Sequence, residues 1–205
     1  MTSGRQPTLS WVELEGERAL LRPVRPSDAE HAFPLIHGRR EVLDGLIWQG
    51  PATLTELADH WMHWATPGDV GFRYLFAIVD KPSARICGTI GLRFHEEPFH
   101  GDTGYWIGSP FWGQGIGTEA IGLLSHLAFR HLEARTVGAE VFLGNTASCR
   151  VLEKNHFVRA AETITREVEG GRREEWVYDL DRERYLTLDP LQPLAESVLL
   201  EPTGR

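Results

Sequence analysis

A glycine-rich turn in the middle of the chain carries the residues best suited to binding chemistry. Glycines at positions 113, 115 and 117 leave backbone N–H groups uncovered by side chains, and the apolar stripe that follows predicts a helix from Thr118 to about His131. N–H groups at a helix N-terminus, together with the positive end of the helix dipole, favour a phosphate or pyrophosphate group. From the turn alone, an equally good interpretation is that the glycines only allow a tight turn between a strand and a helix.

The spacing of the turn narrows the choice of phosphate ligand. A P-loop needs Gly-Lys-Ser/Thr, and no lysine follows Gly115 or Gly117. The dinucleotide pattern G-x-G-x-x-G is nearly met, because Thr118 stands where its last glycine belongs and Glu140 lies at about the right distance downstream. That pattern opens the first unit of a parallel sheet, whereas three antiparallel strands are expected before this turn. A nucleotide-binding domain is therefore the weaker alternative.

Two further stretches accompany the turn in a fixed order. Residues 104–107 (Gly-Tyr-Trp-Ile) precede it, the turn and helix start span residues 112–120 (Trp-Gly-Gln-Gly-Ile-Gly-Thr-Glu-Ala), and residues 145–157 (Asn-Thr-Ala-Ser-Cys-Arg-Val-Leu-Glu-Lys-Asn-His-Phe) follow. With these three stretches the sequence resembles the GNAT-type acyl-CoA N-acyltransferases, and within them the ribosomal-protein N-terminal acetyltransferases. The similarity covers residues 17–182, and three ordered motifs at family spacing are far more specific than a lone glycine turn.

The resemblance implies a mixed α/β fold with a central, mostly antiparallel sheet flanked by helices. Its fourth and fifth strands, here 103–108 and 136–143, splay apart, and the pantetheine arm of acetyl-CoA enters between them. By the same resemblance, the backbone around Ile107 bonds the pantetheine amides or polarises the thioester carbonyl. Asn145 bonds the pantetheine arm, caps the helix that follows it, or does both. The pyrophosphate is expected on the amides of four loop residues and one hydroxyl-bearing residue: Gly113, Gln114, Gly115, Gly117 and Thr118.

The reaction implied is the transfer of an acetyl group from acetyl-CoA to a primary amine, by direct attack in a ternary complex. The amine must be neutral to attack, and the departing thiolate benefits from a proton donor. Many relatives place a tyrosine as proton donor seven residues after the asparagine, but here that position is Leu152. The resemblance therefore points to Ser148 as the proton donor, and capping or packing is its alternative role. Asp102 is the candidate base, with a water-mediated route as the alternative. Three ionisable residues of the preceding loop fit an exposed acidic segment better: His95, Glu96 and Glu97.

Three positions depart from the general pattern of the family. Trp112 takes the place of an arginine or glutamine in the phosphate loop, so binding there must rely on backbone amides. His156 replaces the glycine before Phe157, and Leu152 replaces the usual tyrosine. A CoA-binding module without catalysis therefore stays open as an alternative. The nine histidines show no H-E-x-x-H or related spacing, so no metal site is predicted.

The elements that must position these residues follow from periodicity and turn signals. Ser-x-x-Glu and Thr-x-x-Glu capping boxes, beginning at Ser27 and Thr53, predict two helix starts. Trp61 and Trp64 are expected core anchors, and Trp48 is expected to line the acceptor pocket. We expect an N-terminal arm (1–16), an acyltransferase domain (17–182) and a loosely attached C-terminal tail (183–205). The strands are predicted at 18–24, 72–79, 85–94, 103–108, 136–143, 157–168 and 172–180, and the helices at 28–36, 53–65, 118–131 and 147–155.

Composition limits the partners. The chain has 205 residues, 29 of them acidic and 21 basic, and this net charge of −8 disfavours nucleic acid and anionic membranes as partners. An amine acceptor fits the charge: a protein N-terminus, a small polyamine, an amino sugar or an amino acid. Two cysteines, a polar start at Met1–Pro7 and the lack of an apolar run near 20 residues predict a cytoplasmic protein without a membrane span. A homodimer through the tail or the final hairpin is left open.

Overall fold

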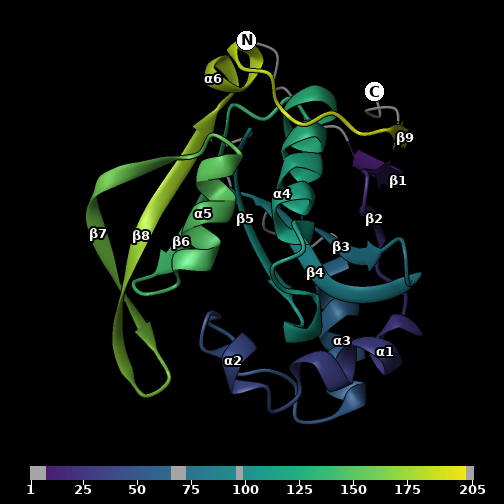
Figure 1. Cartoon of the computed structure of the whole chain (residues 1–205), viewed down its shortest axis with the longest axis vertical. Helices are drawn as coiled ribbons and strands as arrows, with labels where there is room; N and C mark the ends of the chain where they lie inside the picture. Colours follow the sequence, from purple (N-terminus) through teal and green to yellow (C-terminus); the bar gives the residue numbers. More distant parts are fainter. Residues whose placement is uncertain (1–7, 66–72, 96–98, 202–205) are drawn as a thin grey trace.

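The computed structural model describes residues 8–65, 73–95 and 99–201, which form a nine-stranded sheet with helices on both faces (Figure 1). The strand order is β7-β8-β6-β5-β4-β3-β2-β1-β9, and all neighbouring strands are antiparallel except β5 and β6. The predicted mixed α/β class is confirmed. The strands are β1 (Thr8–Glu15), β2 (Ala19–Pro23), β3 (Arg73–Asp80), β4 (Arg85–Phe94), β5 (His100–Ile107), β6 (Thr136–Phe142), β7 (Val158–Val168), β8 (Gly171–Asp181) and β9 (Ala195–Glu201).

The helices divide between the two faces of the sheet. On one face, α1 (Asp28–Ile36) and α3 (Leu54–Ala65) pack on β3 and β4 around a cluster that includes the buried Trp61, as expected for a core anchor. On the other face, α4 (Ile116–His126) and α5 (Thr146–Lys154) cover the larger cluster. Short helices α2 (Arg40–Leu43) and α6 (Arg182–Thr187) complete the set. Among the described residues, no helix is long and apolar enough to cross a bilayer.

Helix α4 follows its apolar stripe closely. The predicted core positions 120, 121, 124, 127 and 128 are all buried, which confirms the face that the periodicity indicated. The helix begins two residues earlier than expected, at Ile116. Its last turn, Leu127–His131, is a π-helix in which the N–H of Leu132 donates to the carbonyl of Leu127 at 3.1 Å.

Of the two expected capping boxes, the cap at Thr53 forms with its reciprocal bond shifted to Ala52, and the cap at Ser27 does not form. At α3, the hydroxyl of Thr53 accepts from the N–H of Glu56 at 3.1 Å, and the Glu56 carboxylate accepts from the N–H of Ala52 at 2.8 Å. At α1, the Ser27 side chain makes no cap hydrogen bond. The predicted capping contact of Ser27 was therefore wrong. The carboxylate of Asp28 instead accepts from the N–H of Arg25 at 2.8 Å and pairs with Arg22.

Strands β5 and β6 are paired over a short length only. Their parallel register joins three residue pairs, from His100 with Thr136 to Asp102 with Gly138. Beyond these pairs β5 stays with β4 as far as Ile107, and β6 stays with β8 as far as Phe142. The two halves of the sheet therefore part after Asp102, as the expected splay between 103–108 and 136–143 requires.

Residues 182–201 are more ordered than the sequence suggested. Strand β9 pairs antiparallel with β1 along its whole length, from Ala195 opposite Glu15 to Glu201 opposite Thr8. Helix α6 begins where the Asp181 carboxylate accepts from the N–H of Arg184 at 2.7 Å. The expectation of a loosely attached tail was therefore wrong, because residues 195–201 form the edge strand of the same sheet.

Candidate active site

The start of α4 carries backbone donors that have no acceptor within the helix. Gly113 and Gly115 have φ values of +71° and +83°, and a Cβ on either would meet nothing within 4 Å. Gly115 is the N-cap, no described side chain caps it, and the first helical bond runs from the N–H of Glu119 to the carbonyl of Gly115. The amides of residues 116–118 thus have no acceptor within the helix. The predicted pyrophosphate loop has the backbone geometry of an anion site.

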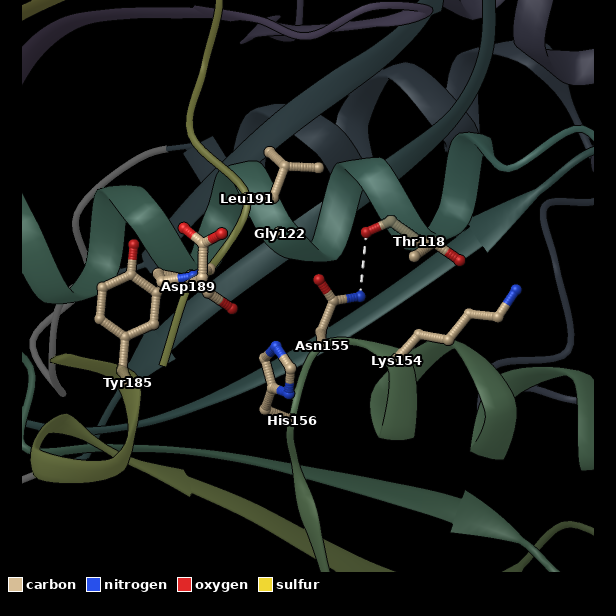
Figure 2. A pocket seen from close by; sticks show the side chains of 10 residues that line it. Thr118, Gly122, Lys154, Asn155, His156, Tyr185, Asp189 and Leu191 are labelled. Carbon is tan, nitrogen blue, oxygen red and sulfur yellow. Dashed lines mark hydrogen bonds between the residues drawn. The ribbon is translucent and has the colours of Figure 1, made fainter. Parts of the chain in front are cut away.

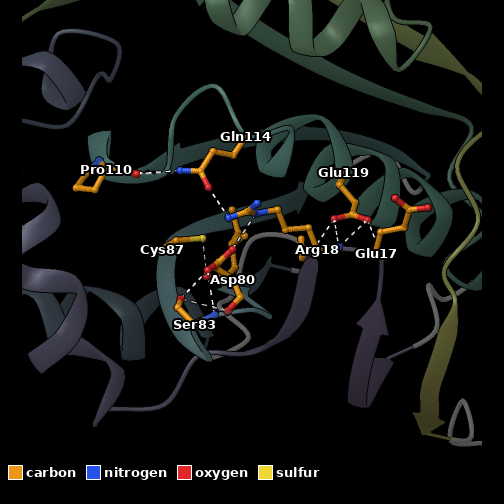
Figure 3. A network of polar contacts seen from close by, with 10 residues as sticks. Glu17, Arg18, Asp80, Ser83, Cys87, Pro110, Gln114 and Glu119 are labelled. Atoms are coloured by element: carbon orange, nitrogen blue, oxygen red, sulfur yellow. Dashed lines mark hydrogen bonds and ion pairs between the residues drawn. The ribbon is translucent and has the colours of Figure 1, made fainter.

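An arginine directly before β2 ties this loop to the sheet (Figure 3). The guanidinium of Arg18 pairs with the buried Asp80 at 2.9 Å and donates to the side-chain oxygen of Gln114. The amide nitrogen of Gln114 donates to the carbonyl of Pro110 at 3.0 Å. The exposed side chain of Gln114 is therefore engaged in intramolecular hydrogen bonds, which leaves its backbone N–H as its group for the expected phosphate contact.

The carboxylate of Glu119 anchors the first turn of α4 to the chain before β2. It accepts backbone N–H groups from Glu17, Arg18 and Ala19, the last at 2.6 Å (Figure 3). A Cβ at Gly16 would lie 2.3 Å from this carboxylate, so the chain approaches it closely only because residue 16 is glycine. Three converging donors hold the helix start in place.

The peptide groups of Ile107 face away from β4. Its neighbour Gly108 donates its N–H to the carbonyl of Cys87 at 2.8 Å, which makes Ile107 and Gly88 a non-hydrogen-bonded pair. The N–H and carbonyl of Ile107 therefore point to the side where β6 has parted. The indole of Trp112 donates to the Ile107 carbonyl at 2.6 Å. Trp112, a departure from the family pattern, thus fixes the backbone at the end of β5.

A pair of hydroxyl groups lies next to the first turn of α4. The hydroxyl of Tyr105 donates to Ser148 Oγ over 3.4 Å, a long hydrogen bond. A Cβ at Gly117 would lie 3.5 Å from the Tyr105 ring and 3.3 Å from Ile107, so glycine lets α4 approach β5 closely. Burial raises the pKa of Tyr105 above its ordinary value, although the bond to Ser148 partly offsets this. Sequence reasoning identified Ser148 but missed Tyr105, because only the sheet order brings the two together.

Asn145 has the capping role foreseen for it. Its side-chain oxygen accepts from the N–H of Ser148 at 3.2 Å at the start of α5. A Cβ at Gly45, just after α2, would lie 2.9 Å from the Asn145 amide nitrogen. The segment after α2 therefore passes directly over this asparagine. The expected contact with the pantetheine arm stays a prediction.

Asp102 lies on the other face of β5 from Tyr105. Side chains alternate along a strand, so Asp102 shares its face with Trp106, which packs with α1 and α3. Its carboxylate pairs with Arg93 and lies 3.2 Å from His95 Nε2. The structure thus separates the two candidate catalytic residues by the thickness of the strand. Glu96 and Glu97 lie outside the described residues.

A small cavity of about 130 Å³ lies between α4 and the C-terminal end of α5 (Figure 2). The amide of Asn155 donates to the carbonyls of Thr118 and Val151, both at 2.9 Å, and so joins the two helices. The exposed Lys154 borders the same cavity and was not singled out from the sequence. His156 has a φ of +67°, so it takes the left-handed conformation that the glycine of the family pattern would favour.

Leu152 and Trp48 both pack against the hydrophobic core. Leu152, at the position of the usual tyrosine donor, is buried in the large core cluster, so it faces the core. Trp48 stacks on His60 with ring centroids 4.5 Å apart and packs against the α1–α3 cluster. Whether Trp48 lines an acceptor pocket is left as a prediction.

Helix α2 lies between the two halves of the parted sheet (Figure 1). Glu41 of this helix accepts from the Ser109 hydroxyl at 3.1 Å, on the β5 side. The carbonyl of Asp44, directly after the helix, accepts from Arg173 of β8 at 2.9 Å. The α2 segment is therefore held from both sides across the parted strands.

An uncapped helix N-terminus beside parted strands is suited to a phosphate-bearing ligand, which backbone amides can hold. Comparison of the sequence with known families gives a match to the acetyltransferase (GNAT) domain over residues 18–158. The chain belongs to the GNAT acetyltransferase family.

Individual relatives agree with this assignment. The uncharacterized N-acetyltransferase p20 of Bacillus licheniformis is 30% identical over 83 residues, which is 40% of this chain and 47% of that protein. The match thus spans about half the length of this curated relative. The fold is similar to a GCN5-related N-acetyltransferase from Brucella melitensis (TM-score 0.73, 20% identity, 91% of this chain and 86% of that chain). It is also similar to RimJ of Mycobacterium smegmatis in complex with CoA-disulfide (TM-score 0.73, 20% identity, 87% and 91%).

Proposed function

We propose that the protein transfers an acetyl group from acetyl-CoA to a primary amine, by direct attack within a ternary complex. One observation carries the proposal: the hydroxyl groups of Tyr105 and Ser148 meet directly beneath the uncapped start of α4, next to the parted strands. This arrangement supports the proposal, because amides suited to an anion and a pair of hydroxyl groups lie close together. When bound, acetyl-CoA supplies an acetyl group activated as a thioester.

The backbone of the glycine loop would hold the pyrophosphate. Gly113, Gly115 and the amides of residues 116–118 offer donors at the positive end of α4, and the solvent-exposed loop leaves them accessible. Lys154 adds a positive charge at the end of α5, near Thr118 (Figure 2). The amides contribute hydrogen bonds and Lys154 contributes a full positive charge, and both favour an anionic ligand.

Tyr105 and Ser148 would stabilise the sulfur that leaves. The Tyr105 hydroxyl is protonated at neutral pH, and burial raises its pKa further, so it donates a hydrogen bond to Ser148 Oγ. The Ser148 hydroxyl can in turn present its own proton to a neighbouring acceptor. Both groups are weak acids, so they act by hydrogen bonding to developing negative charge more than by complete proton transfer.

The acceptor amine would approach from the side of α1, α2 and α3. Asp102 faces this side with His95 beside it, which supports a role in receiving the proton of the amine, directly or through water. The α2 segment spans the parted strands here and would restrict the shape of the acceptor. A protein N-terminus and a small amine both suit this chemistry, and both suit the net charge of −8.

The proposal is tested by following CoA release with acetyl-CoA and a panel of amines: peptides with different N-termini, a polyamine, an amino sugar and free amino acids. We expect turnover with at least one class. Ser148→Ala and Tyr105→Phe should each lower kcat about ten- to hundredfold, with the KM for acetyl-CoA changed less than about threefold. Ser197→Ala, at an exposed serine of β9, is the matched control and should leave kcat unchanged.

Two results would contradict the proposal. Acetyl-CoA that raises the melting temperature without turnover on any amine would indicate a CoA-binding module. Acetyl-CoA that leaves the melting temperature unchanged would exclude the cofactor site itself. Asp102→Asn tests the base separately: a loss of kcat with an unchanged KM for acetyl-CoA supports it, and an unchanged kcat removes Asp102 from the mechanism.

A further inference from the structure

Three side chains with metal-binding atoms converge at the far end of α4. His126 Nε2 lies 2.8 Å and His131 Nε2 lies 3.1 Å from the same oxygen, Oε2 of Glu196. The three donor atoms lie within 4.8 Å of one another, and this is the one such group of three or more in the described part of the chain. Glu196 belongs to β9, so the cluster joins the C-terminal strand to the helix that carries the glycine loop.

The π-helical turn is what brings the two histidines together. In a regular α-helix, residues five apart point about 140° away from each other. The π-helix at Leu127–His131 has wider turns, so positions i and i+5 return to the same face, and the rings of His126 and His131 have centroids 5.5 Å apart. Sequence spacing predicted no metal site, because an i, i+5 pair matches no α-helical ligand pattern. Glu196, 65 residues beyond His131, could not be linked to them by spacing either.

Two of the three separations between the donor atoms are close to those of a metal centre, and the third is within 4.8 Å. Zinc binds imidazole nitrogen and carboxylate oxygen at about 2.0–2.2 Å, so two ligand atoms of a tetrahedral site lie about 3.3 Å apart. The present separations of 2.8 and 3.1 Å need to open by only about half an ångström or less. Glu196 is 40% exposed and His131 is 24% exposed, so water can reach a fourth position.

We propose that His126, His131 and Glu196 bind one divalent transition-metal ion, such as zinc or cobalt, which fastens β9 to α4. Two imidazoles and one carboxylate favour these ions over calcium or magnesium, which need more oxygen ligands. Arg130 lies near His126 and its positive charge weakens the attraction for a cation, whereas the negative charge of the Glu196 carboxylate favours one. Ten residues of helix, about 15 Å, separate His126 from Ile116, so the ion has a structural role away from acetyl transfer.

The test uses the full chain without a histidine tag, freed of metal by a chelator and then titrated with zinc chloride or cobalt chloride. We expect one ion per chain, d–d absorption bands with cobalt, and a rise in melting temperature of about 5–10 °C at a hundredfold excess of zinc over Kd. Glu196→Gln and His131→Asn should each weaken zinc binding at least about tenfold. His131→Asn leaves the His126–Glu196 contact in place, so this variant should still fold.

A matched control separates this site from adventitious binding to surface histidines. His31→Asn replaces an exposed histidine of α1 and should bind zinc and cobalt as the wild type does. The proposal is overturned if both cluster variants bind zinc as tightly as the wild type does. It is also overturned if the wild type binds neither ion at concentrations of about 100 micromolar, because a structural metal site binds more tightly than that. None of these readouts depends on acetyl transfer, so the metal site and the proposed function fail independently.

Discussion

The start of α4 depends on one carboxylate, and Glu119→Gln tests that dependence. Three backbone N–H groups, from residues 17–19, converge on the Glu119 carboxylate, with Ala19 at 2.6 Å and Arg18 at 3.0 Å. Glutamine keeps one acceptor oxygen but places an NH₂ group against donors, so one or two N–H groups lose their partner. Each unsatisfied donor costs about 1–3 kcal/mol, and we expect the free energy of unfolding to fall by about 2–4 kcal/mol.

Urea unfolding and the melting temperature measure this loss. For a chain of this size, about 2–4 kcal/mol corresponds to a fall in melting temperature of about 5–15 °C. Because the same carboxylate fixes the glycine loop, the KM for acetyl-CoA should rise while kcat changes less, since Tyr105 and Ser148 are not altered. Glu30→Gln, at an exposed glutamate of α1, is the control and should be neutral within about 0.5 kcal/mol. If Glu119→Gln proves as stable as this control, the three backbone contacts do not anchor the helix and the reasoning is refuted.

Other substitutions test separate parts of the site. Trp112→Phe removes the indole donor to the Ile107 carbonyl and should lower kcat/KM about three- to tenfold in the CoA-release assay. An unchanged kcat/KM would show that this hydrogen bond does not position the backbone. Gly115→Val forces a β-branched residue to φ +83° and should raise the KM for acetyl-CoA about tenfold or more; equal KM values would exclude loop conformation as the determinant. Burial raises the pKa of Asp80, but hydrogen bonds from Ser83 and the charge of Arg18 lower it by more, so the pKa lies below its ordinary value. The stabilisation by the charged carboxylate is therefore present at neutral pH and is lost as the pH falls below about 4. Asp80→Asn should therefore cost stability in urea at pH 7 and progressively less towards pH 2, and a constant difference across this range would contradict the charge-based origin.

Local signals predicted most of the elements that position the site. The apolar stripe of α4 needs only the order of residues along one helix, and its predicted core positions are buried. The hairpin of β7 and β8 follows from two β-forming runs around a glycine pair. Each of these features is encoded within about twenty residues, and such features can be read without knowledge of the rest of the chain.

Features that depend on distant contacts escaped prediction. Strand β9 forms because residues 195–201 find the free edge of β1, about 190 residues away, and neither segment indicates its partner. Ser27 has the sequence of a cap, but Asp28 accepts from Arg22 and Arg25 instead, so a nearby charge replaced the local contact. The Tyr105–Ser148 pair depends likewise on the placement of α5 over β5, which the sheet order decides.

The parted strands explain why Trp112 fits a site that usually carries a charged or amide side chain. Backbone groups within a sheet normally bond to the neighbouring strand, and a strand that parts from its neighbour leaves them without a partner. Ile107 is nearly buried, at 8% exposure, so its carbonyl would be costly to leave unsatisfied. The Trp112 indole satisfies this carbonyl, while the N–H of Ile107 still faces the parting. A donor-only side chain therefore occupies the acceptor and leaves the donor of the same residue, which is the polarity that the acyl carbonyl of the proposed reaction would need.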